Sequence, residues 1–232
     1  MLQIASMKKI IITVDGWSSC GKSTMARQLA KQLNYIFIDS GAMYRAITLY
    51  FLRNHINTKD PEQVASALSA IQLHFQHNPT NGNNEICLNG ENVEQFIREM
   101  EVAQKVSEVA AIKEVRAFAV KQQQMIGAHK GIVMDGRDIG TAVFPEAELK
   151  IFMTADNEVR VMRRFKELSD KNNTIQLEEV RSNLAQRDHM DSNREVSPLR
   201  KAADAIVLDN SHLTPDEQLD LAMKWAQERI QH

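Results

Sequence analysis

Five short runs of consecutive apolar residues divide the chain, and each ends in a polar or glycine-containing turn. They lie at residues 9–16, 35–41, 131–136, 149–156 and 204–210. Continuous apolar runs of this length are typical of strands buried on both faces, as in a parallel sheet. Segments with helical spacing of apolar residues separate most of them, and the clearest follows the first run. The pattern predicts an α/β fold, an open five-stranded parallel sheet with crossover helices.

The interval after about residue 57 breaks this alternation. Residues 71–75 (IQLHF) and 85–93 (EICLNGENV) have the composition of short strands, and Asn81-Gly82 and Asn89-Gly90 are turn signals. A small antiparallel insert is therefore expected here. The predicted organisation is a core of residues 7–56 and 100–232 and an insert of residues 57–99.

Three helical segments are expected after the insert. Residues 100–130 form one long helical pattern that we expect to be capped at Gly131. Residues 156–194 are rich in charge and predict two helices joined near residues 171–173. The last helix is predicted to begin at Thr214-Pro215-Asp216-Glu217, a capping box with proline at its first position.

The composition is that of an ordinary globular protein. Of 232 residues, 43% are apolar and 25% charged, which is enough for a core without disulfides or structural metal. The net charge of −2 gives no global positive field, so no nucleic acid or membrane partner is expected. Cys20 and Cys87 are too far apart for a CxxC pair and predict neither disulfides nor a zinc site. With no long apolar segment near the start or elsewhere, a cytoplasmic location is expected.

A phosphate-binding loop follows the first predicted strand. Residues 16–23, GWSSCGKS, match GxxxxGK[ST] between a strand and a helix, which makes a chance glycine turn an unlikely alternative. Glycines let consecutive backbone amides turn toward phosphate oxygens, and the helix N-terminus adds partial positive charge. Lys22 is expected to reach the β and γ phosphates of a nucleotide, and Ser23 to bind magnesium. Cys20 is interpreted as a small spacer whose amide matters more than its thiol.

Two arginine-containing turns follow the next predicted strands. DSGAMYR, residues 39–45, follows the second strand, and Gly136-Arg137-Asp138 follows the third. Ligands of parallel sheets bind beyond the carboxyl ends of the strands, so Arg45 and Arg137 are expected beside the phosphate loop. Each segment alone would suit an ordinary polar turn. Together, next to one phosphate loop, they favour an anion site.

The roles of several other charged residues stay open at this stage. Asp135 ends the third strand and could hold magnesium through water, or be an ordinary turn residue. Arg187, Asp191 and Arg194 share one face of a helix, which a solvated salt-bridged surface explains equally well. The same alternatives apply to the arginines of the preceding helix: Arg160, Arg163 and Arg164.

These segments together resemble bacterial cytidylate kinase over almost the whole chain. The resemblance is carried by GWSSCGKST, DSGAMYR, SEVAAIKEVR, DGRDIGTAVFP, LKIFMTAD, QRDHMDSNR and SPLRKAADAIVLDN. DSGAMYR and DGRDIGTAVFP are far more specific than a phosphate loop alone. The family implies a P-loop kinase core, an acceptor domain formed by the insert, and a helical lid at about residues 156–172. It implies phosphorylation of CMP and dCMP with ATP and Mg²⁺.

The resemblance also assigns roles to individual residues. It places cytosine against Ser40, Ser107, Arg116 and Asp138. It places the ribose against Arg187 and Asp191, and the acceptor phosphate against Arg45, Arg137 and Arg194. The ATP phosphates would contact Gly16, Trp17, Ser18, Ser19, Cys20, Gly21, Lys22, Ser23 and Thr24. The catalytic cations would be Lys22, Arg137, Arg194, Arg160 and Arg164, with magnesium on Ser23 and, through water, Asp135.

One departure from the family lies in the loop, where Trp17, Ser19 and Cys20 replace residues of GPSGAGK[GS]T. Gly21, Lys22 and Ser23 remain, so phosphate binding is expected to survive.

Two alternative functions share the phosphate loop, the first in the same class of enzyme and the second in a different class. One is a kinase of another small acceptor, such as shikimate or a different monophosphate. The other is a nucleotide-dependent switch or ATPase, but the chain has neither an NKxD-type guanine motif nor an LSGGQ-type signature. Phosphoryl transfer needs positioning and many cations, because two anionic nucleotides repel each other. The arginines favour a kinase, which we expect to be a monomer.

Overall fold

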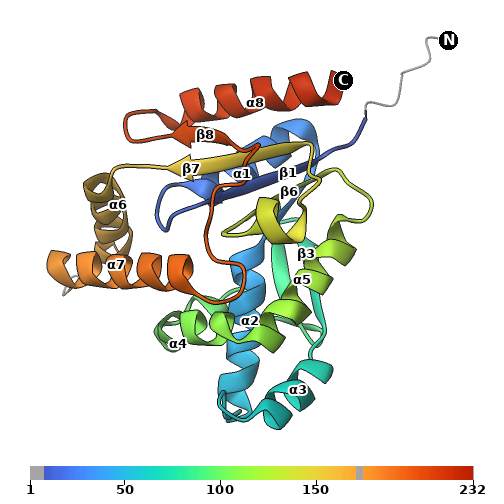
Figure 1. The fold of residues 1–232 in the computed structure, drawn as a ribbon, viewed down its shortest axis with the longest axis vertical. Coiled ribbons are helices and arrows are strands. Elements are labelled where there is room, and N and C mark those ends of the chain that lie inside the picture. Colours follow the sequence, from blue (N-terminus) through green and yellow to red (C-terminus); the bar gives the residue numbers. More distant parts are fainter. Residues whose placement is uncertain (1–7, 171–174, 232) are drawn as a thin grey trace.

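The computed structural model describes residues 8–170 and 175–231. Five parallel strands form the central sheet in the order β2-β6-β1-β7-β8 (Figure 1). Their bounds are β1 Ile11–Gly16, β2 Ile36–Asp39, β6 Ile132–Gly136, β7 Leu149–Thr154 and β8 Ile206–Asp209. Each lies within one of the five apolar runs, so the predicted five-stranded α/β fold is confirmed.

Helices cover both faces of this sheet. One face packs against α1, Lys22–Leu33, and α8, Pro215–Gln231, through Met25, Leu29 and Ala222. The opposite face packs against α2, Ser40–Arg53, and α5, Lys113–Gly127. The strands divide their side chains between the two because alternate residues point to opposite faces. In β6, Val133 belongs to the first cluster, whereas Ile132 and Met134 belong to the second.

The insert contains the expected antiparallel strands and a helix as well. Strands β3 (Leu73–Asn78), β4 (Asn83–Leu88) and β5 (Glu91–Asn92) form a three-stranded sheet. The turns use Gly82, Asn89 and Gly90, all with positive φ. Helix α3 (Pro61–Ser69) precedes the sheet, and a 3₁₀ turn, η1 (Phe96–Arg98), follows it.

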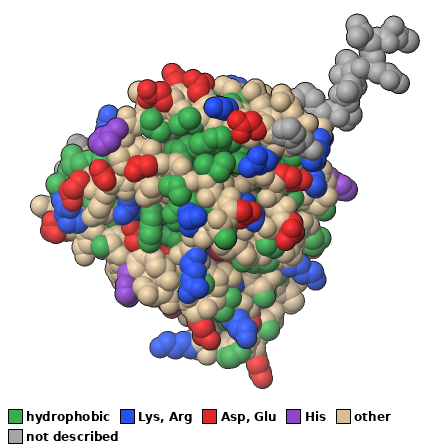
Figure 2. Space-filling model, turned by 45° about the horizontal axis from the view of Figure 1, so that its top comes forward, with side chains coloured by type: hydrophobic (Ala, Val, Ile, Leu, Met, Phe, Trp, Pro, Cys, Tyr) green, Lys and Arg blue, Asp and Glu red, His purple; other side chains and the backbone are tan. Residues whose placement is uncertain are grey.

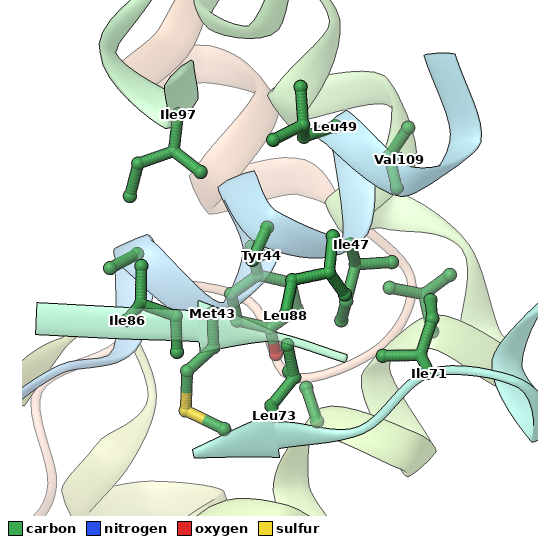
Figure 3. Packing of buried hydrophobic residues seen from close by; sticks show 14 of the residues in the cluster. Met43, Tyr44, Ile47, Leu49, Ile71, Leu73, Ile86, Leu88, Ile97 and Val109 are labelled. Atoms are coloured by element: carbon green, nitrogen blue, oxygen red, sulfur yellow. The ribbon is translucent and has the colours of Figure 1, made fainter. Parts of the chain in front are cut away.

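The insert and the core are packed together through α2. Figure 3 shows Met43, Tyr44 and Ile47 of this helix beside Leu73 and Leu88 of the small sheet. These side chains are buried in the same hydrophobic cluster that reaches the parallel sheet. Helix α2 therefore packs against both sheets and connects the insert to the core.

The single long helix expected at 100–130 is wrong in detail. The segment forms α4, Met100–Ala111, and α5, which are separated at Ile112 by an extended backbone with ψ 127°. The break leaves the Ala110 carbonyl without its helical partner, and Arg116 Nη1 donates a hydrogen bond to it at 3.2 Å. Helix α5 ends at Gly127, and Gly131, with φ +68°, instead forms the turn into β6.

The other helical predictions are confirmed. The segment 156–194 contains α6, Asn157–Ser169, and α7, Leu177–Asn193; the junction expected near 171–173 lies outside the described residues. At the start of α8, Thr214 N donates to Glu217 Oε2 at 2.8 Å and Glu217 N to Thr214 Oγ1 at 3.3 Å, which forms the capping box.

Charges of both signs are interspersed on the surface drawn in Figure 2. Within the described ranges, no helix combines the length and the apolar character needed to cross a bilayer.

Candidate active site

An open cavity of about 610 Å³ lies at the carboxyl end of the parallel sheet. It is bordered by the phosphate loop, the start of α2, helix α4, the turn after β6, and helices α6 and α7. These segments meet because parallel strands all end at the same edge, so the turns that follow them converge. The location is the one expected from the two strand-end arginines.

The phosphate loop has the backbone that its glycines permit. Gly16 has φ +147°, and a Cβ atom there would lie 2.0 Å from the Met153 carbonyl oxygen, so no other residue fits. Gly21 has φ +89° and directly precedes α1, whose first residue is Lys22. Ser18, Ser19 and Gly21 of this turn and Lys22, Ser23 and Thr24 at the start of α1 line the cavity.

Lys22 is buried and folded back onto its own loop. Its Nζ donates to the Trp17 carbonyl oxygen and lies 3.8 Å from Cys20 Sγ. Burial, and then the nearby Arg137 guanidinium, lower the pKa of Lys22. The Cys20 side chain is fully buried and does not line the cavity, in keeping with the spacer role expected for it.

All three polar groups of Ser18 are held by residues from other segments. Asp188 Oδ1 accepts from the Ser18 N–H at 3.4 Å, Arg160 Nη1 donates to its carbonyl at 3.3 Å, and Arg137 Nη2 donates to its hydroxyl at 2.8 Å. Arg160 and Asp188 also form an ion pair, and the Arg160 guanidinium lies over the Trp17 ring, 5.9 Å from its centroid. Arg160 of α6 and Asp188 of α7 thus hold the phosphate loop at Ser18, and we call these contacts the loop clamp.

The loop is held from behind as well. Arg163 donates to Asn210 Oδ1 at 2.9 Å and to its carbonyl oxygen at 3.0 Å. Asn210 Nδ2 in turn donates to the Cys20 carbonyl and to Gln218 Oε1. Arg164, by contrast, lines the cavity, and among the described residues its ion pair is with Glu167 of its own helix, at 2.8 Å.

Asp135 lies beside the hydroxyl of the first α1 turn. Ser23 Oγ donates to its Oδ2 at 2.5 Å, and its Oδ1 is buried without a hydrogen-bond partner in the described part of the chain. Burial, and then the neighbouring Asp39, raise the pKa of Asp135 to about 6. Ser40 Oγ donates to the backbone carbonyl of Asp135 at 2.6 Å and not to its side-chain carboxylate.

Asp39 joins two arginines at the start of α2. It caps the helix by accepting from Ala42 N at 2.9 Å, and it pairs with Arg45 at 2.8 Å and with Arg98 of η1 at 3.3 Å. Burial opposes ionisation of Asp39, but the two guanidinium groups hold its pKa below the usual value.

Carboxylates and arginines alternate on the opposite wall of the cavity. Asp138 pairs with Arg116 and, at 3.3 Å, with Arg194. Asp191 pairs with Arg194 at 3.7 Å and with Arg137 at 2.7 Å. Arg116 is 1% exposed, packs over the Tyr44 ring and lies behind Asp138 rather than in the cavity lining.

Arg187 differs from these arginines, because no carboxylate of the described residues forms an ion pair with it. Burial lowers its pKa to about 10, and the positive charges of Arg137 and Arg164 contribute. A partly buried guanidinium that lies near other arginines and forms no ion pair with the described carboxylates favours the approach of an anion.

The structure brings most of the expected site residues to one cavity. Those lining it are Ser18, Ser19, Gly21, Lys22, Ser23, Thr24, Ser40, Arg45, Ser107, Asp135, Arg137, Asp138, Arg164, Arg187, Asp191 and Arg194. Five are outside the lining: Gly16, Trp17, Cys20, Arg116 and Arg160. Sequence reasoning missed four residues that hold this site together: Asp15, Asp39, Arg98 and Asp188. Asp15 lies next to a motif glycine, Asp39 lies at a strand end and Asp188 lies within QRDHMDSNR, whereas no sequence signal pointed to Arg98.

Comparisons with known proteins identify the family. The cytidylate kinase family model matches residues 12–228. A cytidylate kinase of Bacteroides fragilis is 54% identical over 97% of this chain and 99% of its own length. One from Cytophaga hutchinsonii is 52% identical over 95% of this chain and 94% of its own. A shikimate kinase structure from Bacteroides thetaiotaomicron shares the fold, with TM-score 0.50 and 12% identity over 97% of this chain and all of its own.

Proposed function

The chain belongs to the cytidylate kinase family, and on that premise we propose how its cavity carries out the ATP-dependent phosphorylation of CMP. The observation that carries the proposal is that Lys22, Arg137 and Asp138 line one cavity. The first belongs to a phosphate loop, and the other two to the turn after the neighbouring strand. A donor nucleotide on the loop and an acceptor on the turn would then face each other, and the terminal phosphoryl group would pass directly between them.

The donor phosphates bind the loop from Ser18 to Thr24 in this proposal. The backbone amides and the α1 N-terminus hold the β phosphate, and Lys22 leaves the Trp17 carbonyl to contact the migrating group. Burial, and then the Arg137 guanidinium, lower the pKa of Lys22, and the negative charge of an incoming phosphate would favour its protonated form. Arg160 supports this surface from outside the cavity, and Arg164 reaches it from inside.

The residues present fit a magnesium ion. Ser23 Oγ and the unpartnered Asp135 Oδ1 are hard oxygen donors, which suit Mg²⁺ held through water and phosphate oxygens. When bound, the ion would neutralise charge on the transferring phosphates. Within the described ranges, no group of three or more His, Cys, Asp or Glu could hold a metal without the nucleotide.

The acceptor phosphate would bind between Arg45, Arg137 and Arg194. In the structure, carboxylates occupy all three: Asp39 pairs with the first, and Asp191 with the other two. A phosphate dianion can take over those guanidinium groups through bidentate hydrogen bonds. Since the attacking phosphate is already an anion, the reaction needs no strong general base.

The cytosine and ribose would lie between α4 and the turn after β6. Asp138 accepts from the cytosine amino group, Arg116 keeps that carboxylate in place, and Ser40 and Ser107 border the same space. Arg187 and Asp191 are at the ribose position. Acceptance of dCMP, a monomeric state and a cytoplasmic location remain predictions.

An acceptor panel tests the proposal. ATP and magnesium are incubated with the protein and CMP, dCMP, UMP, shikimate or no acceptor, and ADP release is measured. We expect turnover with CMP and almost none without an acceptor. Lys22→Ala should lower turnover by orders of magnitude while circular dichroism stays unchanged. Equal ADP release with and without CMP would identify a hydrolase instead.

A further inference from the structure

Asp15 is a buried carboxylate that the proposed chemistry does not use. It is the last but one residue of β1, is 5% exposed and does not line the cavity. Burying a carboxylate is costly unless its oxygens are hydrogen-bonded. Its partners therefore indicate what it does.

Both oxygens of Asp15 bind the turn that follows Asp138. That turn, η2 (Ile139–Val143), is a single π-helical turn, closed by Phe144 N donating to the Ile139 carbonyl at 2.7 Å. The first N–H groups of a helical turn have no partner within it. Here Ile139 N donates to Asp15 Oδ1 at 2.8 Å and Gly140 N to Oδ2 at 2.7 Å.

Asp15 is also fixed to the phosphate loop. It directly precedes Gly16, which has no room for a side chain because a Cβ there would lie 2.0 Å from the Met153 carbonyl oxygen. In the β1–β6 ladder it lies opposite Gly136, the residue before Arg137. One side chain thus ties the start of the donor loop to the turn that begins with the acceptor-side residues.

We propose that Asp15 is a positioning residue for the acceptor nucleotide: it sets the place of Arg137 and Asp138 relative to the phosphate loop. The inference rests on the proposed function, in which those two residues hold the acceptor. Asp15 itself contacts no substrate. Its effect should therefore appear in acceptor binding and base preference, and only weakly in ATP binding.

Asp15→Asn is the direct test. An amide offers one acceptor oxygen and one NH₂ group, so one of the two N–H groups would face a donor. At a pH above the Asp15 pKa of about 7, where this side chain is ionised, we expect KM for CMP to rise roughly tenfold. This is the effect of losing one hydrogen bond to a charged group, and the CMP-to-UMP ratio of kcat/KM should narrow. KM for ATP should stay within about twofold. The control is Glu148→Gln, because Glu148 accepts from Ile11 N at 2.9 Å on the same strand, away from the turn.

A second variant displaces the same turn by steric contact with β1. A Cβ at Gly140 would lie 2.8 Å from Thr13 Oγ1, an atom without a hydrogen-bond partner among the described residues. Gly140→Ala should push the turn away and reproduce the Asp15→Asn pattern even if that variant folds poorly. Adding Thr13→Ala removes the nearest atom, leaving Lys150 Cδ at 3.2 Å and Asp15 Oδ2 at 3.3 Å, and should return KM for CMP toward the value of the unsubstituted protein.

The outcomes separate this inference from the proposed function. If Asp15→Asn, Gly140→Ala and Asp138→Asn all leave KM for CMP and the CMP-to-UMP ratio of kcat/KM unchanged, the assignment of the acceptor site is wrong. If Asp138→Asn changes them but Asp15→Asn and Gly140→Ala do not, Asp15 is not a positioning residue. A positioning role is also excluded if both KM values rise together, or if Glu148→Gln gives the same pattern.

Discussion

Replacing Asp138 separates base recognition from the stability of the site. Its carboxylate pairs with Arg116 and Arg194, and all three side chains are almost fully buried. Removing one partner of a buried pair costs about 3–5 kcal/mol. Asp138→Ala also leaves two neighbouring guanidinium groups to repel each other. Since a domain of this kind has only about 5–15 kcal/mol of stability, this variant risks unfolding.

Asp138→Asn keeps the shape and one acceptor oxygen. A carboxylate accepts from the N4 amino group of cytosine but repels the O4 atom of uracil. An amide can turn either its oxygen or its NH₂ group toward the base, so it can satisfy both. Since one such contact discriminates by about 1–3 kcal/mol, we expect the CMP-to-UMP ratio of kcat/KM to narrow by roughly ten- to a hundredfold.

The assay is kcat/KM for both acceptors at saturating ATP, because that ratio reports differential binding in the transition state. Urea unfolding of the same preparations shows whether the variant is folded under assay conditions. An unchanged ratio in a folded Asp138→Asn protein would remove this residue from base recognition and leave it with a structural role between two arginines.

Three further predictions concern the loop clamp, pH and the lid. Asp188→Ala leaves Arg160 buried without its carboxylate, and should lower the free energy of unfolding in urea by about 3 kcal/mol. Glu158→Ala removes an exposed ion pair and should change this free energy little. Equal decreases in the two variants would contradict the clamp. Burial raises the pKa of Asp15 to about 7 from 3.8, so between these values the folded state holds a proton that the unfolded chain has lost. From pH 5 to pH 7, the free energy of unfolding should therefore fall by about 2 kcal/mol more in the unsubstituted protein than in Asp15→Asn. Parallel pH profiles of this free energy for the two proteins would refute the prediction. In hydrogen exchange, the part of α6 around Arg160 should be protected with or without nucleotides, and its C-terminal half should gain protection only when both bind; uniform protection would argue against a lid.

The pattern of apolar residues was sufficient for the architecture. Each continuous apolar run became a strand. The inner strands β6, β1 and β7 are largely buried because helices cover both faces of the sheet, whereas the edge strands β2 and β8 leave Ile36 and Val207 about half exposed. The phosphate loop was equally local, since eight consecutive residues contain the whole backbone requirement. The arginine-bearing turns could be placed beside it because parallel strands end at one edge.

Only the tertiary structure decided which charged groups hold one another. Ser18 and Asp188 are 170 residues apart, and no local spacing predicts that α7 reaches the phosphate loop. The break at Ile112 was also decided by tertiary contacts, because the periodicity of the segment is helical throughout. Arg116 donates to the Ala110 carbonyl beside the break and is itself paired with the buried Asp138. Asp15 looked like the end of a strand, yet it supplies two acceptors to a turn 124 residues away. Periodicity records which face of an element is buried, whereas ion pairs depend on where the crossovers bring the ends of elements together.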